Sequence, residues 1–135
     1  MTFSQLDSNL EVYLRNTELA ERVSPEGANP KLRSFKQKLD VLEERLKGMN
    51  LGYPKEAAEL RIWLDKAEQL RGIRNELVHG RWGLEARQGF VVNILGLPGS
   101  ESQKVKSYTL DGLGELVAFT YEVSTTFWQL RRRLP

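Results

Sequence analysis

Apolar side chains recur at steps of three and four residues along much of this chain, and this spacing is that of an amphipathic helix. The clearest run comprises Leu32, Phe35, Leu39, Leu42, Leu46 and Met49. Asn29 and Pro30 precede it, as an N-cap and a proline at the first helical position would. Gly48 marks the expected end. The sequence therefore predicts a helix from Pro30 to about Gly48 with one apolar face.

Three further segments are predicted to be helical. The first covers about Ser4 to Val23 and stops before a cluster of turn-forming residues. The second runs from Pro54 to His79, with Gly80 in the place of the glycine that often ends a helix in a left-handed conformation. The last begins after Thr109, which is a suitable cap, and continues towards the arginines near the end of the chain.

The stretch before the last helix has a different pattern. Residues 89–95 are rich in β-branched side chains, and Val105–Tyr108 follow a turn at Gly96–Ser100. These two stretches are predicted to form a β-hairpin, which must pack on the helices because an isolated hairpin is only marginally stable. The predicted fold is thus mainly all-α, a single domain over residues 1–135. It has a four-helix bundle and a small β-hairpin before the last helix.

Composition limits the class of protein. The chain has no cysteine, which excludes disulfides, thiolate metal sites and cysteine nucleophiles. Its longest uncharged stretch, residues 88–100, contains glycine and proline and is shorter than the ~20 apolar residues of a membrane span. The N-terminal residues lack the basic start of a signal peptide. A soluble cytoplasmic protein without a membrane segment is predicted.

Charge is unevenly distributed along the chain, although the net charge is only +2. Residues 1–30 are acidic, whereas residues 31–47 and 71–87 are basic and three arginines follow one another at residues 131–133. Basic patches of this kind bind phosphate backbones. Solvated helix faces produce the same pattern, so charge alone leaves both interpretations open.

The apolar face of the helix predicted over 54–79 is interrupted near its end. Continued past Leu70 by steps of three and four, the face reaches Arg71, Arg74, Asn75 and Val78. A buried arginine requires partners, because an unpaired charge in a low dielectric is costly. Either the helix breaks near Gly72, or these residues form an internal ion-pair network, or the face opens into a cleft or a subunit interface.

His79 is the one histidine in the protein. Histidine is the side-chain type that exchanges protons near neutral pH, so His79 is the first candidate for proton transfer. A histidine followed by glycine is also a common helix C-terminus, where it complements the helix dipole. No cluster of metal ligands and no glycine-rich phosphate loop accompanies it. No metal or other cofactor is therefore predicted.

The string Arg74-Asn75-Glu76-Leu77-Val78-His79 resembles the signature of the HEPN superfamily, which is an arginine, a polar residue and a histidine a few positions on. The resemblance implies a HEPN-like helical bundle that forms a homodimer with the two motifs facing each other. It also implies a metal-independent endoribonuclease that cleaves single-stranded RNA, as toxins and antiphage effectors of this superfamily do. An antitoxin or another protein partner is a further expectation. Some members carry a modifiable tyrosine where this chain has Arg81, so control by that modification is not expected.

On this resemblance, the expected catalytic residues are Arg74, Asn75 and His79, and the expected RNA-binding residues are Arg71, Arg81 and Trp82. His79 would transfer protons, Arg74 would hold the phosphate oxygens, and Asn75 would orient the imidazole or the phosphate. For Arg71, a salt bridge to Glu68 or Glu76 stays open as an alternative. For Trp82, the alternative is packing on the core. Two other functions stay open as well, a non-catalytic HEPN-fold module that binds a protein or a nucleotide, and an unrelated helical protein with a coincidental motif.

Overall fold

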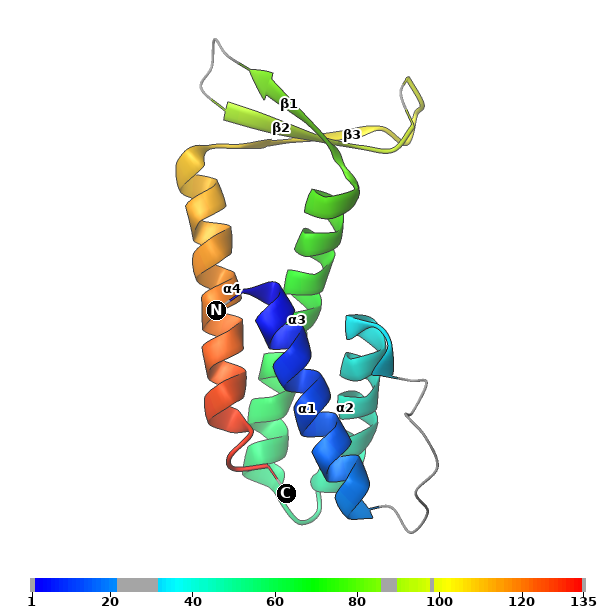
Figure 1. Ribbon diagram of the computed structural model, residues 1–135, viewed down its shortest axis with the longest axis vertical. Helices are drawn as coiled ribbons and strands as arrows, with labels where there is room; N and C mark the ends of the chain where they lie inside the picture. Colours follow the sequence, from blue (N-terminus) through cyan, green and yellow to red (C-terminus); the bar gives the residue numbers. More distant parts are fainter. Residues whose placement is uncertain (1, 22–31, 86–89, 98, 135) are drawn as a thin grey trace. The chain divides into compact units, whose positions relative to one another are not determined.

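The computed structural model describes residues 2–21, 32–85, 90–97 and 99–134 (Figure 1). Over these residues the protein is mainly helical, with a small antiparallel sheet, as the sequence predicts. The elements in chain order are α1 (Phe3–Glu21), α2 (Phe35–Met49), α3 (Pro54–His79), β1 (Arg81–Glu85), β2 (Phe90–Leu95), β3 (Lys104–Tyr108) and α4 (Leu110–Leu130). None of the described helices is both long and apolar enough to cross a membrane.

Local capping explains where α3 and α4 begin and end. Proline starts α3 at position 54 and the helix ends at His79, both as predicted. Thr109 caps α4 as predicted, because its Oγ1 accepts a hydrogen bond from the backbone N–H of Gly112 at 3.0 Å. The bounds of α1 agree with the predicted Ser4–Val23 to within two residues.

The predicted start of α2 is wrong. The helix begins at Phe35 rather than at Pro30, and Leu32 lies before it in a short 3₁₀ turn. Ser34 and Gln37 form a capping box: Ser34 Oγ accepts from the backbone N–H of Gln37 at 3.1 Å, and the backbone N–H of Ser34 donates to Gln37 Oε1 at 3.0 Å. This reciprocal pair fixes the first turn. The predicted Asn29–Pro30 cap lies outside the described residues.

The sheet has three strands rather than the two of the predicted hairpin. Its order is β1-β2-β3 with antiparallel neighbours, and β1 is the strand that was not predicted. The sequence of β1, Arg-Trp-Gly-Leu-Glu, has a central glycine and no β-branched residue, so it carries little strand signal. It forms a strand because β2 offers a free edge directly after the end of α3.

The chain divides into two compact units. The helical unit comprises Met1–Gln69 and Thr120–Pro135, and the sheet unit comprises Leu70–Phe119. Both α3 and α4 contribute a segment to each unit. The sheet unit therefore contains the last part of α3, the three strands and the first part of α4.

The core of the helical unit is built around Trp63 of α3. Its ring lies 4.8 Å from that of Phe127 on α4, and its Nε1–H donates to the carbonyl of Val123 at 2.9 Å. Leucine side chains of α1 and α2 complete the core: Leu6, Leu10, Leu14, Leu39, Leu42 and Leu46. The amphipathic spacing in the sequence thus marks the faces that the helices bury.

A buried cation joins α1 to α2. Lys38 is only 2% exposed, and its Nζ lies 2.6 Å from Asp7 Oδ1 and 3.3 Å from Glu11 Oε2. Glu11 also accepts from Arg15, and this hydrogen bond, with the charge of Lys38, lowers the pKa of the Glu11 carboxyl. The basic region over residues 31–47 is therefore not wholly a solvated face. One of its lysines is a structural partner of the acidic α1.

Replacing Lys38 with alanine should destabilise the protein by about 2 kcal/mol, because two carboxylates lose a buried partner and the lysine stem leaves a gap. Lys47→Ala is the matched control. Lys47 pairs with Glu44 within α2 at 2.9 Å, but both side chains are mostly exposed, so no measurable loss is expected. Urea unfolding followed by circular dichroism measures both variants, and equal stabilities would contradict the role given to Lys38.

Candidate functional site

The predicted site residues all lie in the sheet unit, most of them on the last part of α3. The helix continues through Gly72 to His79 without a break. Burial ends at Leu70, and no residue from Arg71 to His79 is buried. Of the three alternatives for the interrupted apolar face, a helix break and a buried ion-pair network are both excluded. The face opens onto the surface of this chain.

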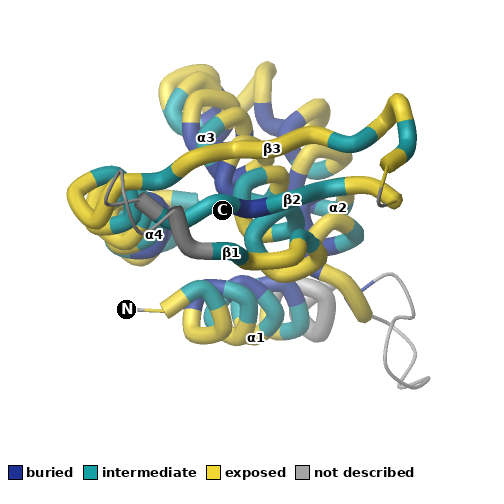
Figure 2. Tube along the Cα trace, turned by 90° about the horizontal axis from the view of Figure 1, so that it is seen from above, coloured by how far each residue is buried: buried dark blue, intermediate teal, exposed yellow. Residues whose placement is uncertain are grey.

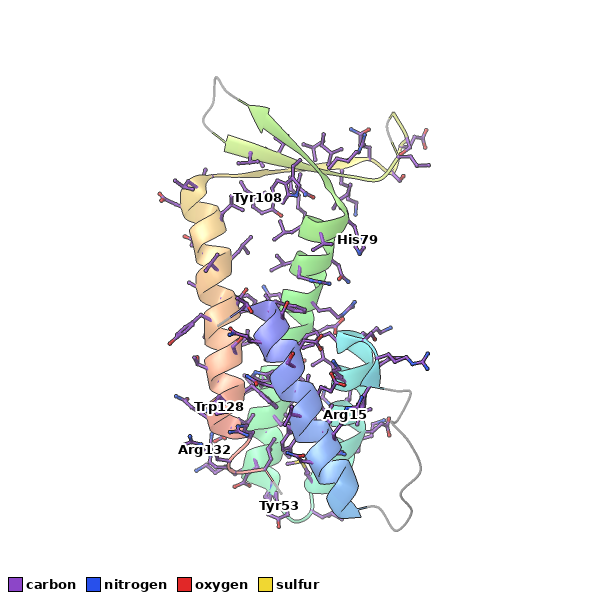
Figure 3. The ribbon with its side chains drawn as sticks, viewed as in Figure 1. Arg15, Tyr53, His79, Tyr108, Trp128 and Arg132 are labelled. Carbon is purple, nitrogen blue, oxygen red and sulfur yellow. The ribbon has the colours of Figure 1, made fainter. Side chains whose placement is uncertain are left out.

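Helical spacing places Arg71, Asn75 and His79, but not Arg74, along one side of α3. Arg71, Asn75 and His79 follow one another at steps of four, and Arg74 lies one turn from Arg71. Arg74 and His79 are exposed, whereas Arg71 and Asn75 are half-buried. Both Arg71 and Arg74 interact with another group in the structure. Figure 3 shows the His79 side chain on the last turn of α3, next to the point where β1 begins.

Gly80 follows the end of α3, but it does not have the conformation predicted for it. Its φ is not positive, so it does not adopt the left-handed conformation. Its backbone N–H still donates to the carbonyl of Glu76 at 2.9 Å. A Cβ at this position would stand 2.0 Å from Oδ1 of Asn93 on β2. Glycine is therefore favoured at position 80, because a larger residue would have to displace the side chain of Asn93.

Two contacts tie the last turns of α3 to the sheet. Lys106 on β3 forms an ion pair with Glu76, and this hydrogen bond raises the pKa of Lys106. Trp82 on β1 donates its Nε1–H to the carbonyl of Leu77 at 3.0 Å. That carbonyl belongs to the last turn of the helix, where backbone acceptors have no partner within the helix.

The two expected RNA-binding residues of β1 are both accessible. Trp82 is 47% exposed, and its ring lies 6.0 Å from that of Tyr108, so it packs partly on the sheet unit and partly faces solvent. Arg81 is exposed, and its guanidinium donates to the carbonyl of Gly96 at 3.3 Å. Neither residue lies in the core. The indole N–H of Trp82 already donates to the carbonyl of Leu77.

The sheet unit buries little. Among the residues whose burial the structure describes, Leu70 and Asn93 are its buried side chains, and the rest are half-buried or exposed. Figure 2 accordingly shows the strands mostly in the colours of half-buried and exposed residues. The described apolar side chains that are most exposed here include Val78, Leu110 and Val117. The sheet unit therefore exposes apolar as well as basic side chains.

The described residues offer no alternative site with stronger chemistry. No group of three or more histidine, aspartate and glutamate side chains among them is placed to hold a metal ion. An open depression of about 550 Å³ lies in the helical unit between α1 and α4. Its lining is uncharged and contains none of the predicted residues: Ser4, Gln5, Ser8, Asn9, Tyr121 and Thr125.

No model of a protein family matches this sequence, and no curated protein or solved structure matches it either. The resemblance to the HEPN superfamily therefore rests on residues 70–82 and stays a hypothesis. What supports a function is the placement and chemistry of the side chains themselves.

The sequence analysis did not find three residues that join α3 to the sheet. They are Glu76, its partner Lys106, and Asn93, which lies beside Gly80. No pattern in the sequence links Lys106 to Glu76, because 30 positions separate the two residues. A weak signal did exist for Asn93. It is the one polar residue in the apolar strand Phe-Val-Val-Asn-Ile-Leu.

Gly72 and Gly80 form a matched pair for testing this end of α3. Gly72→Ala should stabilise the protein by about 0.5–1 kcal/mol, because Gly72 is inside a helix and its Cβ would meet nothing within 4 Å. Gly80→Ala should destabilise it by about 1–3 kcal/mol, because the new Cβ collides with Asn93. Thermal unfolding of the two variants checks the contrast, which a stabilising Gly80→Ala would refute.

Proposed function

We propose that this protein is a metal-independent endoribonuclease that cleaves single-stranded RNA at a composite site formed by two copies of the chain. His79 transfers protons, Arg74 holds the phosphate oxygens, and Asn75 orients the imidazole or the phosphate. A toxin or an antiphage effector is the biological role that such an activity would fit. The observation that carries the proposal is the stretch Arg71–His79, in which no residue is buried and which holds these groups on one helix.

The chemistry explains why two copies are needed. The 2′-hydroxyl oxygen attacks the adjacent phosphorus, the bond from phosphorus to the 5′-oxygen breaks, and a 2′,3′-cyclic phosphate and a 5′-hydroxyl end result. A base must take the proton of the 2′-hydroxyl, and an acid must give one to the leaving oxygen. The chain has one histidine. A two-fold dimer supplies a second imidazole, together with a second guanidinium for the charge on the phosphate.

The exposed apolar surface of the sheet unit supports the dimer. No residue of α3 from Arg71 to His79, and none of α4 from Leu110 to Phe119, is buried. Val117 is 70% exposed and Leu110 is 82% exposed. Apolar surface of this kind on a segment with little core of its own is typical of a protein–protein interface. A second copy of the chain is the occupant that we propose for this surface.

Side chains near the motif supply what RNA binding requires. Arg71 and Arg74 offer guanidinium groups for phosphate oxygens, and Arg81 follows directly after the helix. Trp82 exposes about half of its surface, which is suitable for stacking on an unpaired base. This combination of basic and aromatic side chains fits a single strand better than a duplex.

A second candidate function is a non-catalytic module that binds a protein partner, such as an antitoxin, or a nucleotide. The same exposed apolar and basic surface favours it. His79 then acts only as a cap at the C-terminus of α3, where it complements the helix dipole. The two candidates differ in whether the wild-type protein cleaves RNA.

The purified protein should cleave single-stranded RNA in the presence of EDTA and leave 2′,3′-cyclic phosphate ends. His79→Ala and Arg74→Ala should each lower the rate by about 10² or more, the usual effect of removing a proton carrier or an electrostatic contact. Arg132→Ala is the matched control, because it removes one exposed arginine from the helical unit (Figure 3) and should leave the rate unchanged.

Cleavage that requires a metal ion, or full activity of His79→Ala, would refute this mechanism. If the wild-type protein cleaves no RNA, the non-catalytic module is favoured. In that case His79→Ala should lower stability by about 1 kcal/mol, which is the scale of a dipole contribution, with no chemical activity to lose.

Replacing Val117 with aspartate should convert the dimer to a monomer and abolish cleavage, because a charge would enter the apolar interface. Val12→Asp is the control: Val12 is a comparably exposed valine of α1 in the helical unit, and this variant should stay dimeric. Light scattering after gel filtration measures the mass of each. A wild-type monomer, or a dimeric Val117→Asp protein, would contradict the proposed interface.

A further inference from the structure

We infer that the sheet positions His79 through one row of three side chains, Trp82, Asn93 and Lys106, which we call the sheet row. The row contacts residues on both sides of His79 and thereby fixes the last turn of α3. Its catalytic consequence rests on the proposed function, whereas the contacts themselves do not.

The sheet row takes one residue from each strand. Trp82 of β1 is the direct partner of Asn93 on β2, and Asn93 is the direct partner of Lys106 on β3. Directly opposed residues of antiparallel strands extend to the same face of a sheet. Figure 1 shows the sheet lying across the C-terminal end of α3. The three side chains therefore share the face that is turned towards this helix end.

Each member of the row makes a different contact with the helix end. Lys106 pairs with the side chain of Glu76, and Trp82 donates to the carbonyl of Leu77 at 3.0 Å. Asn93 fills the space beside Gly80 that a Cβ would occupy. Two of these contacts precede His79 in the chain and the third follows it immediately. The backbone that carries the histidine is thus held from both sides.

An exposed catalytic side chain needs such support. The His79 side chain is exposed, so packing around the ring does little to fix it. It is also the last residue of α3, and helix ends fray because their final carbonyls lack partners within the helix. The position of the imidazole is then only as well defined as the last turn. A catalytic group must stay within a fraction of an ångström of its productive position, which the sheet row makes possible here.

Of the three residues in the sheet row, Asn93 is the one whose presence the stability of the fold explains least. Its side chain is 0% exposed, and neither amide atom has a hydrogen-bond partner among the described residues. A leucine of similar size in the middle of this apolar strand would avoid an unpaired buried amide. An unpaired buried polar group calls for an explanation, such as a functional role or a bound water. The amide lies against the residue after His79, which is where a positioning group would have to be.

The test uses Lys106→Met and Asn93→Leu, with Lys106→Arg as the conservative rescue. Lys66→Met is the matched control, because Lys66 on α3 pairs with Glu122 on α4 at 3.0 Å at a similar exposure, but within the helical unit. Lys106 and Lys66 are both surface residues, so these variants remain folded even if Asn93→Leu does not.

The first readout is nuclear magnetic resonance of the His79 ring, which needs no assignment because the chain has one histidine. Lys106→Met and Asn93→Leu should shift and broaden the ring signals and speed amide exchange at residues 77–80. Lys106→Arg should restore both, and Lys66→Met should change neither. Ring signals and exchange rates like those of the wild type in Lys106→Met would overturn the inference.

The second readout is RNA cleavage. Lys106→Met should lower kcat by about ten- to a hundredfold with KM within twofold, since it displaces a catalytic group without removing a phosphate contact. An altered ring with unchanged kcat would overturn the positioning role. An altered ring in a protein whose wild type cleaves no RNA would support the sheet row and refute the proposed function instead.

Discussion

The buried face of α3 ends at Leu70, and the candidate site lies on the surface because the rest of the helix has no buried residue. Up to that point the helix packs through Trp63 into the core of the helical unit. Beyond it the same helix continues to His79 with no buried residue. Helix formation is cooperative, so a segment with a firmly packed first part can extend into turns that bury little. That extension carries polar and basic side chains to the surface.

Much of the helical architecture could be predicted from the sequence, because apolar spacing and capping residues act locally. The limits of α3 follow from Pro54 at its start and from Gly80, which comes directly after His79. The cap at Thr109 follows from the hydroxyl that it offers to the first turn of α4. The start of α2 was misplaced because two N-terminal signals compete, and the capping box at Ser34 prevails over the proline at position 30.

Features that arise from contacts between distant segments could not be predicted. The strand β1 forms because of its neighbour β2 and not because of its own composition. The burial of Lys38 depends on α1 lying beside α2. The motif residues themselves were visible as an interrupted apolar face. Their attachment to the sheet through Lys106 was not, because it depends on the register of three strands.

The close contact between Gly80 and Asn93 has a consequence for how this sequence can change over evolution. Each residue removes freedom from the other, since a larger residue at position 80 needs a smaller one at position 93. The residues at these two positions should therefore vary together among descendants of this chain. A lineage that keeps the glycine is free to keep the amide, and only one with a smaller residue at position 93 no longer needs the glycine.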